Sequence, residues 1–529
     1  MSQRRARAAT IPVLAAAALL GACAVGPAFH KPEAPAHAGY SVEPLPQKGA
    51  ATPAQGGEAQ ELITGSDLPF QWWELFHSPE LNSLIQRAFE ANPSIRSAQA
   101  TLRQAEEQVY AQRGYFFPTL DAGYQFERQQ LAGNLSGSSA PGVQGNGVDI
   151  QALQSPTPPY NKPLWYNFHT AQLTVGYVPD VFGSNRRQLE SLAAQAEAQR
   201  FNLEATYITL ATNVAAAAIQ EASVRAQLAA VQDIIDANEK SLRILRAQLT
   251  AGYAMGIDVA AQEAALAQAK ALLPPLQKQL EQTRDLLRAL AGQLPSEELP
   301  QTFRLDALTL PREIPLSVPA RLIEQRPDVR VAQAQLHSAN AQVGVAVAAM
   351  LPQFNITGTA GGTATAFKDM FASGGPFWSA VGGVSAPLFH GGTLLHQKRA
   401  AEQALKEAAS QYQLTVITAY QNVADSLHAA LSDAAAFQAD WDAEQAAKVT
   451  FDLTQKQMQL GYVNYLSLLS AEAAYQQAVL SRVQAQAARY GDTVALFQAL
   501  GGGWWNRGSE VGRDHATTPD QAPARATTD

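Results

Sequence analysis

The sequence has little charge, no long apolar run after its N-terminus and almost no cysteine. Asp, Glu, Lys and Arg make up 16% of its 529 residues, against roughly 25% in a typical soluble domain. The lack of any stretch of about 18 uncharged apolar residues excludes a bundle of membrane-spanning helices, so any crossing of a membrane requires β-strands. The net charge of −8 favours no nucleic-acid partner.

The single cysteine, Cys23, excludes an intramolecular disulfide and a paired-cysteine metal or redox motif. Arginines and a short apolar stretch precede it, as in a secretory signal. Residues 20–23, Leu-Gly-Ala-Cys, resemble a lipobox, in which small residues precede the cysteine that receives the lipid. We therefore expect a signal peptide at 1–22 and a lipid, including palmitate, on Cys23. By resemblance to other lipoproteins, Ala24 in place of Asp favours the outer membrane. The alternative is a secretory signal that contains a cysteine by chance.

No catalytic motif is present. The nine histidines fall in no metal-ligand spacing, and there is no GxSxG, HExxH or P-loop sequence. The glycines near Gly361 lack the Lys-Ser/Thr ending of a phosphate loop. We therefore expect no enzymatic activity, no metal site and no cofactor other than the covalent lipid.

The chain contains an internal duplication, visible in residues that punctuate secondary structure. Two pairs of matching residues or dipeptides lie 234 positions apart, and four further pairs lie 209 positions apart. The first set is Asn92-Pro93 with Arg326-Pro327 and Phe117-Pro118 with Leu351-Pro352; the second is Asn213-Val214 with Asn422-Val423, Gly252-Tyr253 with Gly461-Tyr462, Glu263 with Glu472, and Gly292 with Gly501. Each half therefore has the order helix, strand-rich segment, very long helix, tight turn, helix.

A coiled-coil pattern runs through the first long helix. From Leu203 to Leu249, alternating steps of four and three residues meet apolar residues at twelve of fourteen positions, the exceptions being Glu221 and Asn238. This spacing of 3.5 residues predicts a left-handed supercoil. A continuous helix from Arg186 to Leu249 would be about 95 Å long.

The second long helix follows the same register less regularly. From Tyr412 to Met458, nine of the fourteen positions are apolar, so we expect more of this helix to line water. Two rods of this length do not fit a globular core, but a tube of helices accommodates them.

The segments between the helices predict membrane-facing strands. Their apolar and aromatic residues alternate, with many Gly and Thr, over residues 117–131, 168–178, 352–361 and 377–388. Four antiparallel strands cannot close a barrel, and an open edge in lipid is forbidden. Closure therefore needs several chains, and three copies would supply twelve strands. The alternative, a soluble helical rod with two surface hairpins, explains neither the lipid anchor nor the aromatic strands.

Several motifs resemble a known family in order along the chain. They are CAVGP at 23–27, WWELFHSPEL at 72–81, RPDVR at 326–330, PLFHGG at 387–392, YQNVADSL at 420–427, GYVNYLSLL at 461–469 and LGGGWW at 500–505. Together they resemble the OprM/NodT branch of the TolC-like outer membrane factors, the efflux lipoproteins of tripartite efflux systems. The resemblance covers nearly the whole chain from Cys23 to Trp505.

The resemblance implies an α+β membrane protein: a homotrimer whose long α-helical coiled-coil barrel continues into a twelve-stranded transmembrane β-barrel, four strands per chain. It also implies a duct that carries drugs or other small molecules across the periplasm and the outer membrane. The partners would be a periplasmic adaptor (a membrane fusion protein) and an inner-membrane pump, most simply of the RND type that confers multidrug resistance.

The turns around Gly252-Tyr253 and Gly461-Tyr462 mark the ends of the long helices, remote from the strands, where we expect an iris-like gate. Relatives carry a Leu and an Asp at the second turn. Here Leu466 matches the Leu, near Ser467, but Ser470 replaces the Asp. Asp258 of the first turn would supply charge instead, or simply cap its helix. Leu466 is equally compatible with ordinary helix packing.

These patterns divide the chain into five parts. They are the signal peptide (1–22), a lipidated tether (23–70), a first repeat (71–310), a second repeat (311–505) and a disordered tail (506–529). Two other functions remain open: the outer-membrane component of a type I secretion system, which usually lacks a lipid anchor, and a structural lipoprotein that bridges outer membrane and periplasm.

Overall fold

The computed structural model describes residues 24–33, 35, 39–131 and 164–507, so the predicted signal peptide, Cys23 and most of the predicted tail lie outside it. The chain divides into two compact units. Unit 1 comprises residues 1–30, 104–196 and 334–409, and unit 2 comprises residues 31–103, 197–333 and 410–529.

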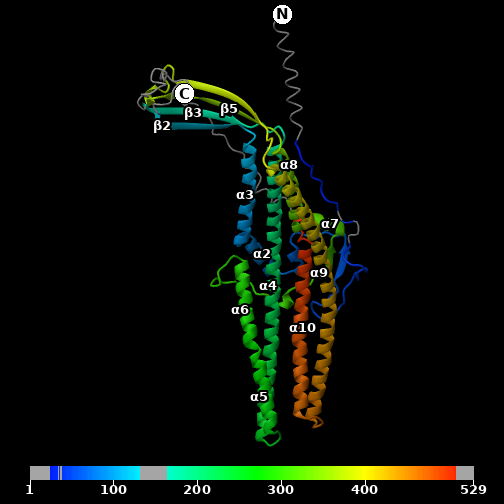
Figure 1. Ribbon diagram of the computed structural model, residues 1–529. Helices are drawn as coiled ribbons and strands as arrows, with labels where there is room; N and C mark the ends of the chain where they lie inside the picture. Colours follow the sequence, from blue (N-terminus) through cyan, green and yellow to red (C-terminus); the bar gives the residue numbers. More distant parts are fainter. Residues whose placement is uncertain (1–23, 34, 36–38, 132–163, 508–529) are drawn as a thin grey trace, which may run out of the picture. The chain divides into compact units, whose positions relative to one another are not determined.

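Unit 1 contains a four-stranded antiparallel sheet, drawn as a curved ribbon sheet in Figure 1. Its strands are β2 (Thr119–Leu131), β3 (Leu164–Tyr177), β5 (Gln353–Ala364) and β6 (Pro376–Ser385), in that order across the sheet. The short η4 (Phe367–Asp369) joins β5 to β6. All four predicted strands are confirmed. In the described chain, β2 and β6 form the two edges of the sheet.

The predicted alternation places apolar side chains where nothing in the described chain covers them. Leu120, Tyr124 and Phe126 of β2 are exposed, as are Trp378 and Val384 of β6. Exposed apolar residues in this number on one sheet indicate contact with lipid or with another chain.

Four helices contribute residues to both units: α3 (Pro93–Gly114), α4 (Ser184–Thr250), α8 (Pro327–Ala348) and α9 (Thr393–Gln459). The two long helices of the duplication, α4 and α9, have 67 residues each, as the repeat predicts. At the start of α4, the Asp180 carboxylate accepts hydrogen bonds from the N–H groups of Asn185 and Arg186, at 3.0 and 2.9 Å. These bonds satisfy two of the free amides that begin any helix.

The predicted seam of α4 is buried. Eleven of its fourteen positions are buried in the chain, and only the last, Leu249, is exposed. The two polar positions, Glu221 and Asn238, are buried with their apolar neighbours, at 0% and 2% exposure. Buried polar groups require partners, so the seam must provide them at these two levels.

The seam of α9 departs from the predicted register after Val423. Leu427 and Ala434 are buried, whereas the predicted positions Ser426 and Asp433 are only half-buried. From Val423 to Phe437 the buried residues follow steps of four, three, four and three in place of the predicted three, four, three and four, so the mean spacing stays at 3.5 residues. Apolar residues thus occupy the seam at two levels where the predicted register has polar ones, and the lower apolar count along α9 does not by itself indicate contact with water.

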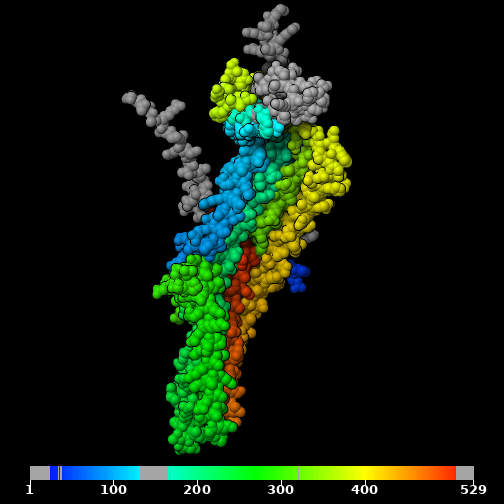
Figure 2. All heavy atoms as spheres, turned by 60° about the vertical axis from the view of Figure 1, so that its left-hand side comes forward, coloured from blue at the N-terminus to red at the C-terminus, as the bar shows by residue number. Residues whose placement is uncertain are grey.

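Unit 2 holds the remaining elements. They are β1 (Glu61–Thr64), η1 (Trp72–Phe76), α2 (Pro79–Ala91), α5 (Gly256–Ala271), α6 (Leu273–Leu290), η3 (Leu305–Ala307), β4 (Glu313–Leu316), α7 (Pro319–Gln325), α10 (Tyr465–Ala499) and η5 (Trp504–Asn506). The first returning helix is broken into α5 and α6 at Leu272, just before Pro274 and Pro275, which lack the N–H groups that a continuous helix needs. The second, α10, is continuous, and Figure 2 shows it in red to orange alongside the green segment that contains α5 and α6.

The segment predicted as an extended tether is part of the folded structure where it is described. β1 pairs in parallel with β4, from Glu61 opposite Glu313 to Thr64 opposite Leu316. The guanidinium of Arg489, on α10, donates to the carbonyls of Gly56 and Glu58 at 2.6 and 2.9 Å. The weak periodicity of this segment signals the absence of a helix, while backbone hydrogen bonds, which have no sequence period, hold it in place.

The start of the predicted tail is also held. Asn506 ends η5 and donates to the carbonyl of Leu68 at 2.8 Å. Arg507 forms an ion pair with Glu204 at 2.9 Å and lies over the rings of Phe70 and Tyr207. The boundary of the folded part therefore lies at least two residues beyond Trp505.

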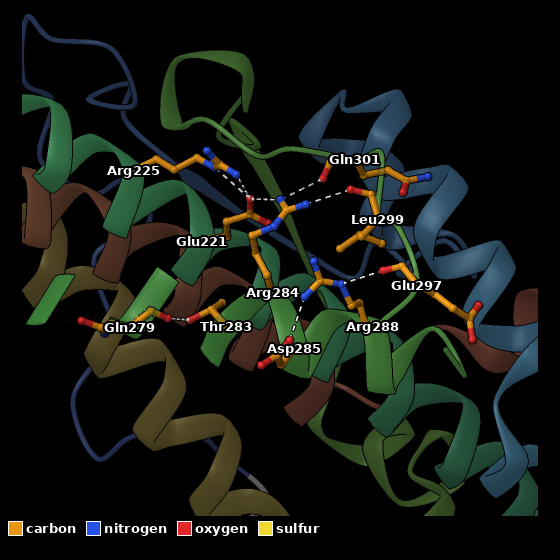
Figure 3. Close-up of polar contacts among 10 residues, drawn as sticks. All are labelled: Glu221, Arg225, Gln279, Thr283, Arg284, Asp285, Arg288, Glu297, Leu299 and Gln301. Carbon is orange, nitrogen blue, oxygen red and sulfur yellow. Dashed lines mark hydrogen bonds and ion pairs between the residues drawn. The ribbon is translucent and has the colours of Figure 1, made fainter. Parts of the chain in front are cut away.

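Figure 3 shows how the buried charge of the α4 seam is compensated. The Glu221 carboxylate accepts from Arg225, at 2.6 Å, and from Arg284 of α6, at 2.9 Å. Arg284 also donates to the carbonyls of Leu299 and Gln301 at 2.9 and 3.5 Å. One arginine thus joins α4, α6 and the loop after α6.

Candidate functional site

The two predicted turns end the long helices in the same way. At the first, Gly252 has φ +78°, its N–H donates to the Leu249 carbonyl, and the Tyr253 N–H donates to the Gln248 carbonyl. The second turn repeats both bonds, from Gly461 to Met458 and from Tyr462 to Gln457, with φ +79° at the glycine. This is the left-handed helix cap for which glycine is preferred. No atom lies within 4 Å of a Cβ built at either glycine, so backbone conformation alone accounts for them.

Helix caps also begin the returning helices. The Asp258 carboxylate accepts from the N–H of Met255 at 3.1 Å, so this residue does cap α5. In the second turn, the Asn464 side chain accepts from the N–H and the hydroxyl of Ser467, at 2.9 and 2.8 Å. The Asp258 carboxylate is therefore engaged in a hydrogen bond at the start of its own helix in this conformation.

The predicted gate residues at the second turn lie on the surface of the single chain. Leu466 is 65% exposed, and Ser470 is exposed one helical turn later. The aromatic residues after the two glycines, Tyr253 and Tyr462, are exposed as well. Packing within the chain does not bury Leu466, which leaves its side chain free for contact with another copy or with the contents of a pore.

Below the turns, a buried polar joint connects the two helical hairpins. We define the inter-hairpin joint as Asn238 of α4, Gln262 of α5, and Tyr465 and Glu472 of α10. The Gln262 amide donates to the Asn238 side-chain oxygen at 2.9 Å, and Asn238 donates to Glu472 Oε1 at 3.3 Å. The Tyr465 hydroxyl donates to Gln262 Oε1. The structure thus brings together residues of both halves of the duplication.

The joint perturbs its titratable groups. Burial raises the pKa of the Glu472 carboxyl above its usual value, and the hydrogen bond from the Gln476 amide, 3.1 Å long, opposes this in part. Burial, followed by the nearby charges of Glu472 and Asp258, raises the pKa of Tyr465 to about 12. Tyr465 is therefore a neutral donor at any physiological pH.

Sequence reasoning missed the joint, although one signal pointed to it. Asn238 was one of the two polar interruptions of the apolar seam, and Glu472 was one of the duplicated residues. What the sequence lacks is any indication that these two residues, 234 positions apart, meet in space.

A second constellation lies in unit 1, where the chain leaves the predicted lipidation site. The Val25 N–H donates to the Phe182 carbonyl at 3.2 Å, and Arg187 donates to the Val25 carbonyl at 3.0 Å. A Cβ on Gly183 would lie 2.7 Å from the Cα of Ala24. The residues after Cys23 are therefore seated against the turn between β3 and α4.

The contacts of residues 24–29 continue along α8, and we call this whole set of contacts the seat of the segment. A Cβ on Gly26 would lie 2.5 Å from the Cα of Gly344, so the close approach of the two backbones requires glycine at position 26. The ring of Phe29 stacks on His337, with centroids 4.2 Å apart, and His337 contacts Glu190 at 2.9 Å.

Neither constellation has the composition of a metal centre. Among the described residues, no group of three or more His, Cys, Asp or Glu side chains could hold a metal ion. No helix in the described part of the chain is long and apolar enough to cross a membrane.

Comparison with known proteins identifies the family of this chain. The sequence profile of the outer membrane efflux proteins matches residues 84–293 and 318–502, one stretch in each half of the duplication. The chain belongs to the outer membrane efflux protein family.

Relatives of this outer membrane efflux protein cover almost its whole length. The pyoverdine export outer membrane protein OpmQ of Pseudomonas putida is 29% identical over 87% of this chain and 93% of its own. The toluene efflux pump outer membrane protein TtgC of the same species is 27% identical over 92% and 94%. The outer-membrane channel OprN has the same fold, with a TM-score of 0.77 at 24% identity, over 91% of this chain and all of its own.

The predicted family and fold class are confirmed, as are the outer-membrane location and the role in efflux. The family is one of channels and not of enzymes. Homologues are components of efflux pumps, so this efflux protein works with partner proteins.

Proposed function

We propose that this efflux protein is the trimeric exit duct of a tripartite pump, through which small molecules pass from an inner-membrane pump across the periplasm and the outer membrane. The observation that carries the proposal is the four-stranded sheet with apolar residues exposed and with β2 and β6 as edges. An open strand edge in lipid leaves backbone groups without partners. Three copies, each joining its β6 to the β2 of the next, form a closed barrel of twelve strands.

The duct closes at the turns Gly252–Asp258 and Gly461–Ser470. Each turn follows a 67-residue helix that begins soon after a strand of the sheet, so the length of that helix separates the turn from the strand. Three copies of the exposed Leu466 would form an apolar ring at this end. Because Ser470 replaces the carboxylate of relatives, that ring works here without acidic residues from the second turn. Asp258, which caps α5, adds the nearest carboxylate of the first turn.

Cys23 carries the lipid that anchors the duct in the outer membrane. The seat for residues Ala24 to Phe29 supports this proposal, since it holds the chain next to the turn that follows β3. A lipid on Cys23 therefore attaches the chain to the membrane next to the end of β3. No other cofactor is required.

The partners are a periplasmic adaptor and an inner-membrane pump, which we propose to be of the RND type. The names of the relatives, which include toluene, solvent and antibiotic efflux pumps, support small organic molecules as the cargo. The chain contributes a passage, so selection among such molecules belongs to the pump.

Conductance across planar lipid bilayers tests the duct. Purified full-length protein should run as a trimer and conduct weakly, and Leu466→Ala should raise the conductance severalfold by widening the apolar ring. The same variant should admit antibiotics passively into cells. Matched substitution of the buried Leu468, which does not face a pore, should not raise conductance. Trimers that never conduct, including those with Leu466→Ala, would instead favour a structural lipoprotein.

A further inference from the structure

The inter-hairpin joint lies at Asn238, one of the two polar positions in the apolar seam of α4. On one side of Asn238 lies a cluster of Val231, Ile234, Ile235 and Ala269, and on the other side a cluster of Leu242, Leu245 and Val259. Tyr465 packs against the second cluster. If α10 separates from the first hairpin, the hydrogen bonds from Asn238 to Glu472 and from Tyr465 to Gln262 must break.

Glu472 is the one ionisable carboxylate within the joint, and protons can reach it. Its side chain, 6% exposed, lines a groove of about 880 Å³ between α4, α9 and α10. In the described chain, its Oε1 accepts hydrogen bonds from the neutral side-chain amides of Asn238 and Gln476. Other charged groups line the groove: Arg225, Asp233, Arg304, Asp306, Glu444 and Arg482.

The cations around Glu472 are engaged elsewhere in the described chain. Ion pairs join Arg482 to Glu444, Lys270 to Glu239, Arg225 to Glu221 and Arg304 to Asp306. Of the other carboxylates on these elements, Asp233 of α4 lines the same groove, Asp236 of α4 accepts a hydrogen bond from Gln232, and Asp258 caps α5. All three are acidic and supply no positive charge to Glu472. Glu263, the duplicate of Glu472, is exposed and pairs with Arg246 at 2.6 Å. The two halves of the duplication thus hold one paired and one unpaired glutamate.

We propose that Glu472 makes the gate respond to pH: its neutral form holds the two hairpins together, and its ionised form favours their separation. The inference rests on the gate proposed above and adds its regulation.

The direction of the response follows from the surroundings of the carboxyl. In the closed joint, burial raises the pKa of Glu472, and when the hairpins separate the group returns to water and to its usual pKa. Closure is therefore fully favoured below the usual pKa of a glutamate, and this contribution is lost as the pH rises through the raised value. Acidification closes the duct. Tyr465 keeps its proton throughout this range because its pKa is near 12.

Conductance of full-length trimers carrying Leu466→Ala, a variant chosen to give measurable currents, tests the proposal. Between about pH 7.5 and about pH 5, the ratio of open to closed channels should fall by up to about tenfold per subunit for each unit by which closure raises the pKa. Adding Glu472→Gln keeps the shape and hydrogen-bonding oxygen of the side chain but cannot ionise, so the channel should stay mostly closed at both pH values. The matched control, Glu263→Gln, should keep the full pH response.

Hydrogen exchange over residues 465–476 gives a second readout that does not depend on currents. After correction for the intrinsic effect of pH, protection should increase on acidification in the parent protein and be independent of pH with Glu472→Gln. If the trimers conduct but Glu472→Gln leaves the pH response intact, the role of Glu472 is overturned and the duct stands. If no variant conducts at any pH, the duct fails, and the inference fails with it.

Discussion

At the scale of single residues, Glu221 depends on Arg284 for its place in the seam. The carboxylate is fully buried, and Arg284 supplies one of its two cations while also binding two loop carbonyls (Figure 3). Arg284→Met keeps most of the side-chain volume but leaves a buried carboxylate with one partner fewer. We expect a loss of about 3 kcal/mol of stability, the usual cost of breaking a buried ion pair from one side. The midpoint of thermal unfolding, followed by circular dichroism, measures it.

The exposed ion pair of Arg304 with Asp306 provides the control. Arg304→Met should leave the melting temperature unchanged, because ion pairs in water contribute little. Equal shifts for the two variants would show that the burial of Glu221 is not what makes Arg284 important.

Cys23 carries a second prediction at this scale. Cys23→Ser should abolish incorporation of radiolabelled palmitate, since no other cysteine exists in the chain. Because the seat of residues 24–29 consists of hydrogen bonds and close packing in unit 1, the fold should survive the loss of the lipid. Label that still enters the variant would contradict the assignment of Cys23.

At the scale of elements, the helical turns depend on glycine for backbone reasons alone. Gly461 has φ +79° with open space around it, so Gly461→Ala should cost about 1 kcal/mol through the left-handed conformation. Gly491, inside α10, also has open space but no positive φ. There the same substitution should raise the melting temperature, because alanine favours a helix by up to about 1 kcal/mol over glycine. Shifts of the same sign at both positions would refute this account of the turn.

The elements also show what a sequence can predict. Period and punctuation were enough for the four strands, the two long helices and the turns at Gly252 and Gly461, because each follows from local geometry. The seam of α9 beyond Val423 was predicted wrongly, because a strict alternation of steps led to the polar residues Ser426 and Asp433 and not to the apolar residues next to them. The meeting of Asn238 with Glu472 was not predictable, because it depends on how two hairpins pack.

At the scale of the whole molecule, β2 and β6, the two edges of the sheet in the described chain, predict how copies assemble. In a Cys23→Ser background, we place one cysteine at Ala122 of β2 and a second at successive positions along β6, beginning at Trp378. If β6 of one copy pairs with β2 of the next, some of these pairs should form disulfides that link copies. Non-reducing gels should then show dimers and closed trimers, with no larger species, because a ring of three has no free edge.

An inner strand supplies the control for that experiment. Leu173 of β3 lies between Ala122 of β2 and Ala360 of β5, so both of its neighbours belong to its own chain. A cysteine there, combined with one at Ala360, should cross-link within a single copy and leave the monomer band unchanged in mass. Ladders that extend past the trimer would indicate open-ended association, and cross-links from Ala122 to β6 of the same chain would indicate a barrel that closes without partners. Either result would remove the argument for three copies, since that argument depends only on the pairing of β6 of one copy with β2 of the next.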